Sequence, residues 1–234
     1  MLKTLTAAEL PFVVKVCGIT SEDDLETSVE AGANAIGFNF YPKSPRFLTA
    51  ERARRIAGSV RGQYLKVGVF VNPTEEELIE TASLAPLDVL QLHGDPALAR
   101  SRRKIRNGQP ATAPSQSRLG KEAFRVWRSA HPGMAREALD PNVEAWLLDT
   151  PTPQYGGSGK SFDWSLATGF PRRAIIAGGL DASNVTIAIR VARPWGVDAC
   201  SRLESTPGQK DPARIKLFVE TALAAFQSRL ELHI

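Results

Sequence analysis

The stretch FVVKVCGI, residues 12–19, decides the fold, because it is a β-branched run that ends at a cysteine and a glycine. A nearly continuous apolar run of this kind is typical of a parallel strand that is buried on both faces of its sheet. The next segment, SEDDLETSVEAG (21–32), starts with Ser21 as a candidate helix N-cap and carries three acidic residues directly after it. The sequence therefore predicts a strand followed by a helix.

The same pairing recurs along the chain. Seven more short apolar runs follow, each with a helical or helix-length segment after it: 35–40, 65–71, 88–94, 123–129, 145–150, 173–179 and 196–201. The clearest later helical patterns cover 73–85, 181–192 and 211–226. Eight such units in 234 residues predict a single-domain (β/α)8 TIM barrel. A doubly wound open sheet is the weaker alternative, because no G-x-G-x-x-G follows the first strand.

Two segments are not part of this repeating pattern. Residues 1–11 are expected to be an N-terminal extension, with the barrel domain over 12–234. Residues 101–122 are rich in glycine, proline, serine and threonine, which predicts a surface loop.

Composition and charge narrow the classes of partner. No apolar run of 18 residues occurs, and the first residues lack a signal-peptide pattern, so we expect no membrane partner. The two cysteines do not make a disulfide framework, which favours the cytoplasm. A net charge of +4 permits an anionic ligand. The most basic stretch, RSRRKIR (100–106), has no interleaved aromatic residue, so a solvated helix face is favoured and no nucleic acid is expected.

The barrel prediction places the functional site at the carboxyl ends of the strands. Cys17 ends the first strand, where a thiol either fills core space or acts as a base or nucleophile. Asp149 follows the sixth strand, where a buried carboxyl would have a raised pKa and could donate a proton near neutral pH. Its alternative role is to cap the next turn. Together the two residues are a candidate acid–base pair.

Two other strand ends carry candidate substrate-binding groups. Arg46 lies after the second strand in a loop stiffened by Pro42 and Pro45, which suits bidentate binding of a carboxylate. The alternative is a solvated basic loop. Gln91 and His93 end the fourth strand, as polar groups of the site wall or as hydrogen-bonded core residues.

Glycine-rich loops follow the sixth, seventh and eighth strands. Such loops and helix starts offer backbone N–H groups to anions, and barrels often bind phosphate after strands seven and eight. The candidate phosphate-binding residues are Gly157, Ser158, Gly159, Gly178, Gly179 and Ser201. No set of residues has the spacing of metal ligands. The strand ends together predict proton transfer on a phosphorylated sugar.

Seven blocks of the sequence resemble the successive motifs of phosphoribosylanthranilate isomerase, an enzyme of tryptophan biosynthesis. They run from about Val13 to Phe226 in the family's order: KVCGIT, GFNFYPKSPRF, VGVFVN, LQLHGD, LLDT with YGGSGKSFDW, AGGLDASNV and GVDACSRLESTPGQKDP. The resemblance implies an Amadori rearrangement of N-(5-phosphoribosyl)anthranilate to 1-(2-carboxyphenylamino)-1-deoxyribulose 5-phosphate. No metal or organic cofactor is expected, and the protein is expected to be a monomer or a homodimer.

The same resemblance implies a role for each matching site residue. Cys17 would be the general base that takes the proton from C2 of the sugar. Asp149 would be the general acid that protonates the ring oxygen. Arg46 would orient the anthranilate carboxylate, and the phosphate would rest on the glycine-rich loops.

The last motif departs from the family's usual S-S-G-V-E. Here Cys200 opens it, and Arg202 replaces a glycine, so that this arginine either points away from the phosphate or contacts it. Because the eighth strand of a closed barrel pairs with the first, Cys200 is expected near Cys17, and oxidation is hypothesised to link them.

Two other functions stay open at this point. One is another phosphosugar barrel enzyme of amino-acid biosynthesis. The other is a non-catalytic barrel that binds a phosphorylated ligand, although the presence of both Cys17 and Asp149 argues against it.

Overall fold

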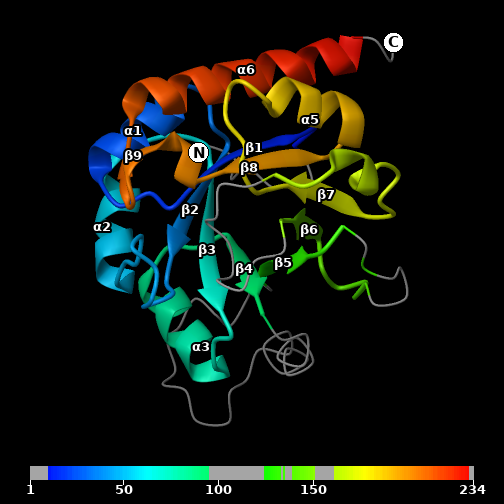
Figure 1. Cartoon of the computed structure of the whole chain (residues 1–234). Helices are drawn as coiled ribbons and strands as arrows, with labels where there is room; N and C mark the ends of the chain where they lie inside the picture. Colours follow the sequence, from blue (N-terminus) through cyan, green and yellow to red (C-terminus); the bar gives the residue numbers. More distant parts are fainter. Residues whose placement is uncertain (1–9, 95–123, 133, 135–138, 151–160, 232–234) are drawn as a thin grey trace.

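The computed structural model describes residues 10–94, 124–132, 134, 139–150 and 161–231 (Figure 1). Eight parallel strands form a closed barrel in chain order. They are β1 (Val13–Cys17), β2 (Ala35–Asn39), β3 (Leu65–Val71), β4 (Val89–His93), β5 (Arg125–Ala130), β6 (Ala145–Leu148), β7 (Arg173–Ile176) and β8 (Gly196–Ala199). The predicted (β/α)8 barrel is confirmed, and the open-sheet alternative is wrong because β1 pairs with both β2 and β8. Most of the extension predicted at 1–11 and the loop predicted at 101–122 lie outside the described residues.

Helices cover the outside of the barrel. The described ones are α1 (Glu22–Glu30), α2 (Ala50–Ser59), α3 (Glu75–Leu84), α5 (Val185–Ala192) and α6 (Pro212–Glu231), with a 3₁₀ turn at Trp164–Ala167. Figure 1 shows α6 along the β1–β8 side of the barrel, in contact with both α1 and α5. Ser21 caps α1 as predicted, since its side chain accepts from the Asp24 N–H at 3.1 Å. Thr74 and Glu77 form a capping box on α3.

Two helices differ from the sequence prediction. The sequence predicted only a helix-length segment where α2 lies, since four of its ten residues are charged, yet Ala53, Ile56 and Ala57 form a buried stripe at helical spacing. Helix α5 begins at Val185 rather than at residue 181. The Asp181 carboxylate accepts from the Ser183 N–H at 2.8 Å, so this segment closes a local turn before the helix starts.

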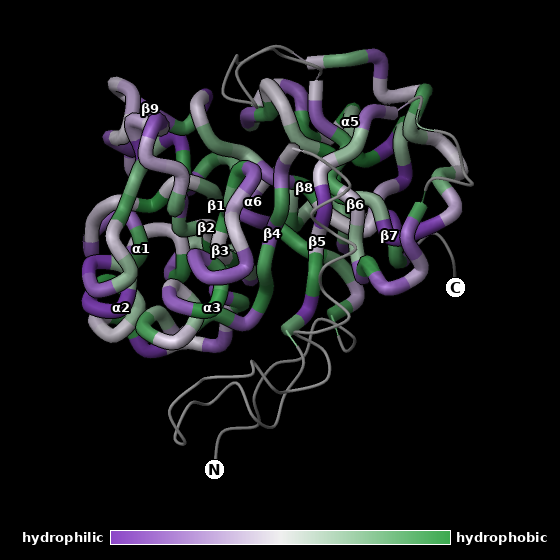
Figure 2. The backbone as a smooth tube through the Cα atoms, turned by 90° about the horizontal axis from the view of Figure 1, so that it is seen from below, coloured by the Kyte–Doolittle hydropathy of each residue, from purple (hydrophilic) through white to green (hydrophobic). Residues whose placement is uncertain are grey.

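The barrel has two cores, one on each side of the strands. Along β1, Val14 and Val16 point outward into the layer beneath the helices, whereas Val13 lies in the barrel interior. Hydrophobic colour accordingly concentrates in the strands of Figure 2, while α2 is largely hydrophilic. The lower interior is apolar and is filled by Trp127 and its neighbours. Towards the carboxyl ends of the strands, buried Lys15 and other polar groups replace the apolar residues, so polar side chains lie directly beneath the site.

Within the part of the chain that the structure describes, we find no helix with both the length and the apolar character needed to cross a membrane.

Candidate active site

A cavity of about 420 Å³ opens at the carboxyl ends of the strands. It is lined by both members of the predicted acid–base pair, Cys17 and Asp149. The other predicted residues on its wall are Arg46, Gln91, His93, Gly178, Gly179 and Ser201. The three remaining candidates, Gly157, Ser158 and Gly159, lie outside the described residues. The fold thus brings every predicted site residue that the structure describes to one cavity.

The Cys17 thiol is almost enclosed, with 7% of the residue exposed. Its neighbour across the strand pair is Gly37, and a Cβ at that position would lie only 2.7 Å from the sulfur. Gly18 follows with a φ of +73°, and a Cβ there would lie 2.6 Å from Cδ of Arg46. The thiol therefore occupies a space that Gly37 leaves open, while Gly18 leaves room for the Arg46 side chain.

A buried ion pair that sequence reasoning missed lies beneath the thiol. Lys15 Nζ donates to Asp198 Oδ2 at 2.8 Å, and Lys15 is fully buried. Burial is the largest single effect and opposes the charge on Lys15, but Asp198 and Cys17 together outweigh it and raise the lysine pKa, so the group is an ammonium. The charge of this ammonium also acts on the nearby Cys17 and works to lower the pKa of its thiol. A buried cation therefore faces the candidate base.

Asp149 lies at the end of β6, across the barrel mouth from β1. Its Oδ1 accepts from the Thr150 N–H at 2.7 Å, so the residue also makes the local turn contact that was its alternative role. Burial raises the pKa of the Asp149 carboxyl, against the opposing effects of that N–H and of the Lys15 charge. The neutral acid is thereby favoured closer to physiological pH than for an exposed aspartate.

His93 is held in place on the wall of the cavity. Its ring lies 2.8 Å from Gln91 Nε2 and 2.7 Å from Ser129 Oγ. Burial, with a further contribution from the Lys15 charge, lowers the His93 pKa to about 4. The ring is therefore neutral at physiological pH and serves as a polar group rather than a cation.

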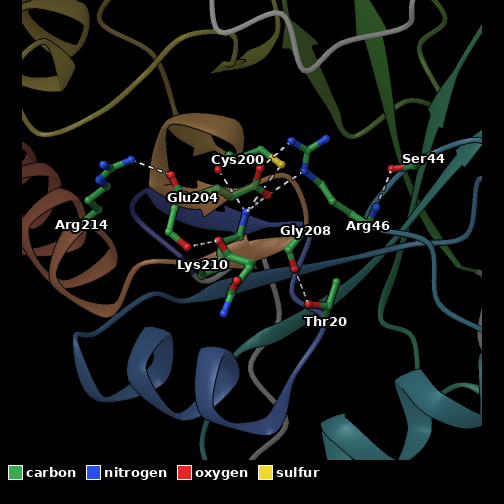
Figure 3. Close-up of polar contacts among 10 residues, drawn as sticks. Thr20, Ser44, Arg46, Cys200, Glu204, Gly208, Lys210 and Arg214 are labelled. Carbon is green, nitrogen blue, oxygen red and sulfur yellow. Dashed lines mark hydrogen bonds and ion pairs between the residues drawn. The ribbon is translucent and has the colours of Figure 1, made fainter.

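Arg46 is fixed by the eighth-strand loop rather than left in solvent (Figure 3). Its Nε and Nη2 donate to the two carboxylate oxygens of Glu204 at 2.7 and 2.6 Å. Glu204 begins a short hairpin of β9 (Glu204–Thr206) and β10 (Gln209–Lys210), and Lys210 Nζ donates to it at 2.9 Å. A guanidinium has five N–H groups, so this bidentate pair uses only part of its donor capacity.

The loop after β7 meets the loop after β8 at the cavity. Gly178 and Gly179 have φ values of +83° and +64°, a backbone that glycine adopts without strain. Arg202 Nη1 donates to Asp181 Oδ2 at 2.7 Å, so this arginine bridges the two loops while lining the cavity. Among the residues that the structure describes, no cluster of three or more His, Cys, Asp or Glu side chains is arranged to hold a metal ion.

Comparison with known proteins decides between the functions left open above. Residues 14–221 match the family model described as N-(5'phosphoribosyl)anthranilate (PRA) isomerase. The chain belongs to this isomerase family. An N-(5'-phosphoribosyl)anthranilate isomerase from Solibacter usitatus is 46% identical over 217 residues, which cover 91% of this chain and 98% of the relative. The family assignment favours an isomerase over a non-catalytic barrel or a different phosphosugar enzyme.

Solved structures support the assignment of the chain to this isomerase family. The crystal structure of phosphoribosyl anthranilate isomerase from Thermotoga maritima has a TM-score of 0.72 and 37% identity, covering 91% of this chain and 99% of that one. A second solved isomerase, in complex with reduced 1-(o-carboxyphenylamino)-1-deoxyribulose 5-phosphate, has a TM-score of 0.68 and 34% identity, with coverage of 91% and 99%. A solved relative therefore binds a phosphorylated small molecule.

Proposed function

We propose that this isomerase converts N-(5-phosphoribosyl)anthranilate to the deoxyribulose phosphate of tryptophan biosynthesis through Cys17 as general base and Asp149 as general acid. The observation that carries the proposal is their meeting at one cavity, from the ends of β1 and β6. Cys200 and burial raise the pKa of the Cys17 thiol, and the buried Lys15 ammonium opposes that rise, so Lys15 is the group that favours a thiolate at Cys17. Burial supports a neutral carboxyl at Asp149.

The first step opens the sugar ring. The Asp149 carboxyl donates its proton to the ring oxygen while the bond between that oxygen and C1 breaks. The lone pair of the anthranilate nitrogen forms a double bond to C1, which gives a positively charged imine and a new hydroxyl group. The acid must be neutral beforehand, and the raised pKa of Asp149 meets that need.

The second step moves a proton from C2. The Cys17 thiolate takes it, and the bonding electrons form a C1–C2 double bond as the imine nitrogen regains its lone pair. The resulting enolamine becomes the ketone when the C2 hydroxyl loses its proton and C1 gains one. General acid–base groups of this kind typically contribute about 10²–10⁴-fold each to the rate.

Binding is assigned to the remaining predicted residues. The donor capacity of Arg46 beyond its pair with Glu204 suits the anthranilate carboxylate, and Gln91 and His93 offer polar contacts to the sugar. We assign the phosphate to the loops that carry Gly178, Gly179 and Ser201, together with the predicted nest Gly157, Ser158 and Gly159. The reaction as written needs no metal or organic cofactor.

The cellular location, oligomeric state and domain bounds of the enzyme stay predictions. We place it in the cytoplasm, and the two cysteines, which are free thiols, fit a reducing compartment. It is expected to be a monomer or a homodimer, and the barrel domain is assigned to 12–234 after an extension at 1–11.

The test is the loss of anthranilate fluorescence from freshly made substrate, with product identified by mass spectrometry. Cys17→Ser and Asp149→Asn should each lower kcat by about 10²–10⁴-fold. Asp23→Asn is the matched control, because Asp23 is exposed on α1 and does not line the cavity. If either site variant retains the wild-type rate, its assigned role is wrong.

A further inference from the structure

A second thiol lies beside the proposed base. Cys200 directly follows β8, and β8 pairs in parallel with β1 through Val16 and Ala199. Cys17 and Cys200 are the next residues along this pairing, and both line the cavity. Both are free thiols. The chain's only two cysteines are therefore neighbours inside the active site.

Cations face this pair from both sides. Lys15 lies on the same face of β1 as Cys17, and its charge favours the ionised form of that thiol. On the other side, Lys210 Nζ lies 3.7 Å from the Cys200 sulfur and donates to its carbonyl oxygen at 3.0 Å (Figure 3). The positive charge of Arg46, in the loop after β2, interacts electrostatically with both cysteines. Positive charge is therefore available to stabilise one thiolate, whether Cys17 or Cys200 carries it.

The anionic groups around the pair limit it to one negative charge. Glu204 at the start of β9 binds Lys210 and Arg46, Asp198 of β8 binds Lys15, and Asp149 faces the site from β6. Two adjacent thiolates would repel each other and these carboxylates. A thiol and a thiolate, in contrast, form one strong hydrogen bond. The interaction with Cys17 lowers the pKa of Cys200, while the interaction with Cys200 and burial raise the pKa of Cys17.

We propose that Cys200 is a positioning residue that shares one proton with Cys17, so that the two thiols ionise as a unit. The inference rests on the proposed role of Cys17 as general base. The balanced step is transfer of the Cys17 S–H proton to the Cys200 thiolate, which leaves a thiolate at Cys17 and a thiol at Cys200. A group that belongs to a coupled pair titrates with the pKa of the pair.

The first experiment is a pH titration of ultraviolet thiolate absorbance in the wild type, Cys200→Ser and Cys17→Ser, with the double variant as the baseline. The wild type should form its first thiolate at a lower pH than either single variant, by about 0.3 pH unit or more, since two sites share one charge. Coincident midpoints in the wild type and Cys200→Ser would overturn the proposal. The titration needs no catalysis, so it is independent of whether Cys17 is the base.

The second experiment follows kcat/KM against pH in Cys200→Ser. Serine cannot carry the negative charge in place of Cys17. The rising limb of kcat/KM should therefore move to higher pH, and for an evenly shared proton its plateau should rise by about two-fold or more, because Cys17 is then fully ionised. A structural role for Cys200 would instead scale the rate equally at every pH and leave the midpoint unchanged, which would refute the shared proton. Retained activity in Cys17→Ser would refute the base assignment alone.

Discussion

Lys15→Met removes the buried cation beneath the active site while keeping a side chain of similar length. Lys15 is fully buried, Asp198 is 7% exposed, and their charged atoms are 2.8 Å apart. Removing one partner of such a pair leaves an uncompensated charge, which typically costs about 3–5 kcal/mol of unfolding free energy. In a chain of this size the expected fall in Tm is about 6–20 °C.

The matched control is the double variant Lys15→Met with Asp198→Asn. It removes the stranded carboxylate as well, so most of the lost stability should return. The loss in Lys15→Met should also depend on pH. Burial raises the folded-state pKa of Asp198, and without Lys15 nothing of comparable strength opposes that rise. The penalty is therefore present above the unfolded pKa of the carboxyl and should shrink as the pH falls towards it.

The assay is urea unfolding followed by tryptophan fluorescence, near neutral pH and at mildly acidic pH. A loss below about 1 kcal/mol at neutral pH would refute the reasoning, because it would mean that the pair has no net effect on stability. A loss that grows on acidification would refute it too, because protonation should relieve the stranded carboxylate.

Three further changes separate backbone strain, oxidation and helix capping. Gly18→Ala should cost about 1–3 kcal/mol and raise KM, because φ is +73° and the new Cβ would press on Arg46; an unchanged Tm contradicts this. Mild peroxide should join Cys17 and Cys200, lowering the intact mass by two hydrogen atoms and abolishing activity until reductant is added; inactivation with no such mass change argues against the disulfide. Thr74→Ala should cost about 1 kcal/mol with kcat/KM unchanged, as measured by melting and turnover, since Thr74 caps α3 outside the cavity.

The strands could be predicted because each buried strand is a local run of apolar residues. A strand that faces helices on one side and the barrel interior on the other needs apolar side chains at nearly every position, as in LKVGVFV of β3. Helix α2 carries a weaker local signal, since only a narrow stripe of small and apolar residues touches the barrel. Its formation depends on tertiary packing as much as on propensity.

The site was predictable where a motif occupies a strand end, as at Cys17 and Asp149. Its supporting contacts were not, because their partners are far apart in sequence. Lys15 meets Asp198 across 183 positions, and Arg46 meets Glu204 across 158. No local sequence pattern indicates such pairs. The Pro207–Gly208 turn, with φ of +86° at the glycine, could nevertheless have indicated the hairpin that begins at Glu204.

The closure of β1 against β8 also has a consequence for synthesis of the chain on the ribosome. Cys17 is made well before the Asp198 that pairs with the lysine beneath it, because Asp198 is 183 positions later than that lysine. Contacts of such separation form slowly, because a long loop must close before they can stabilise anything. While those positions are being made, a nascent chain therefore carries the thiol of the proposed base without the charged groups that surround it in the folded barrel.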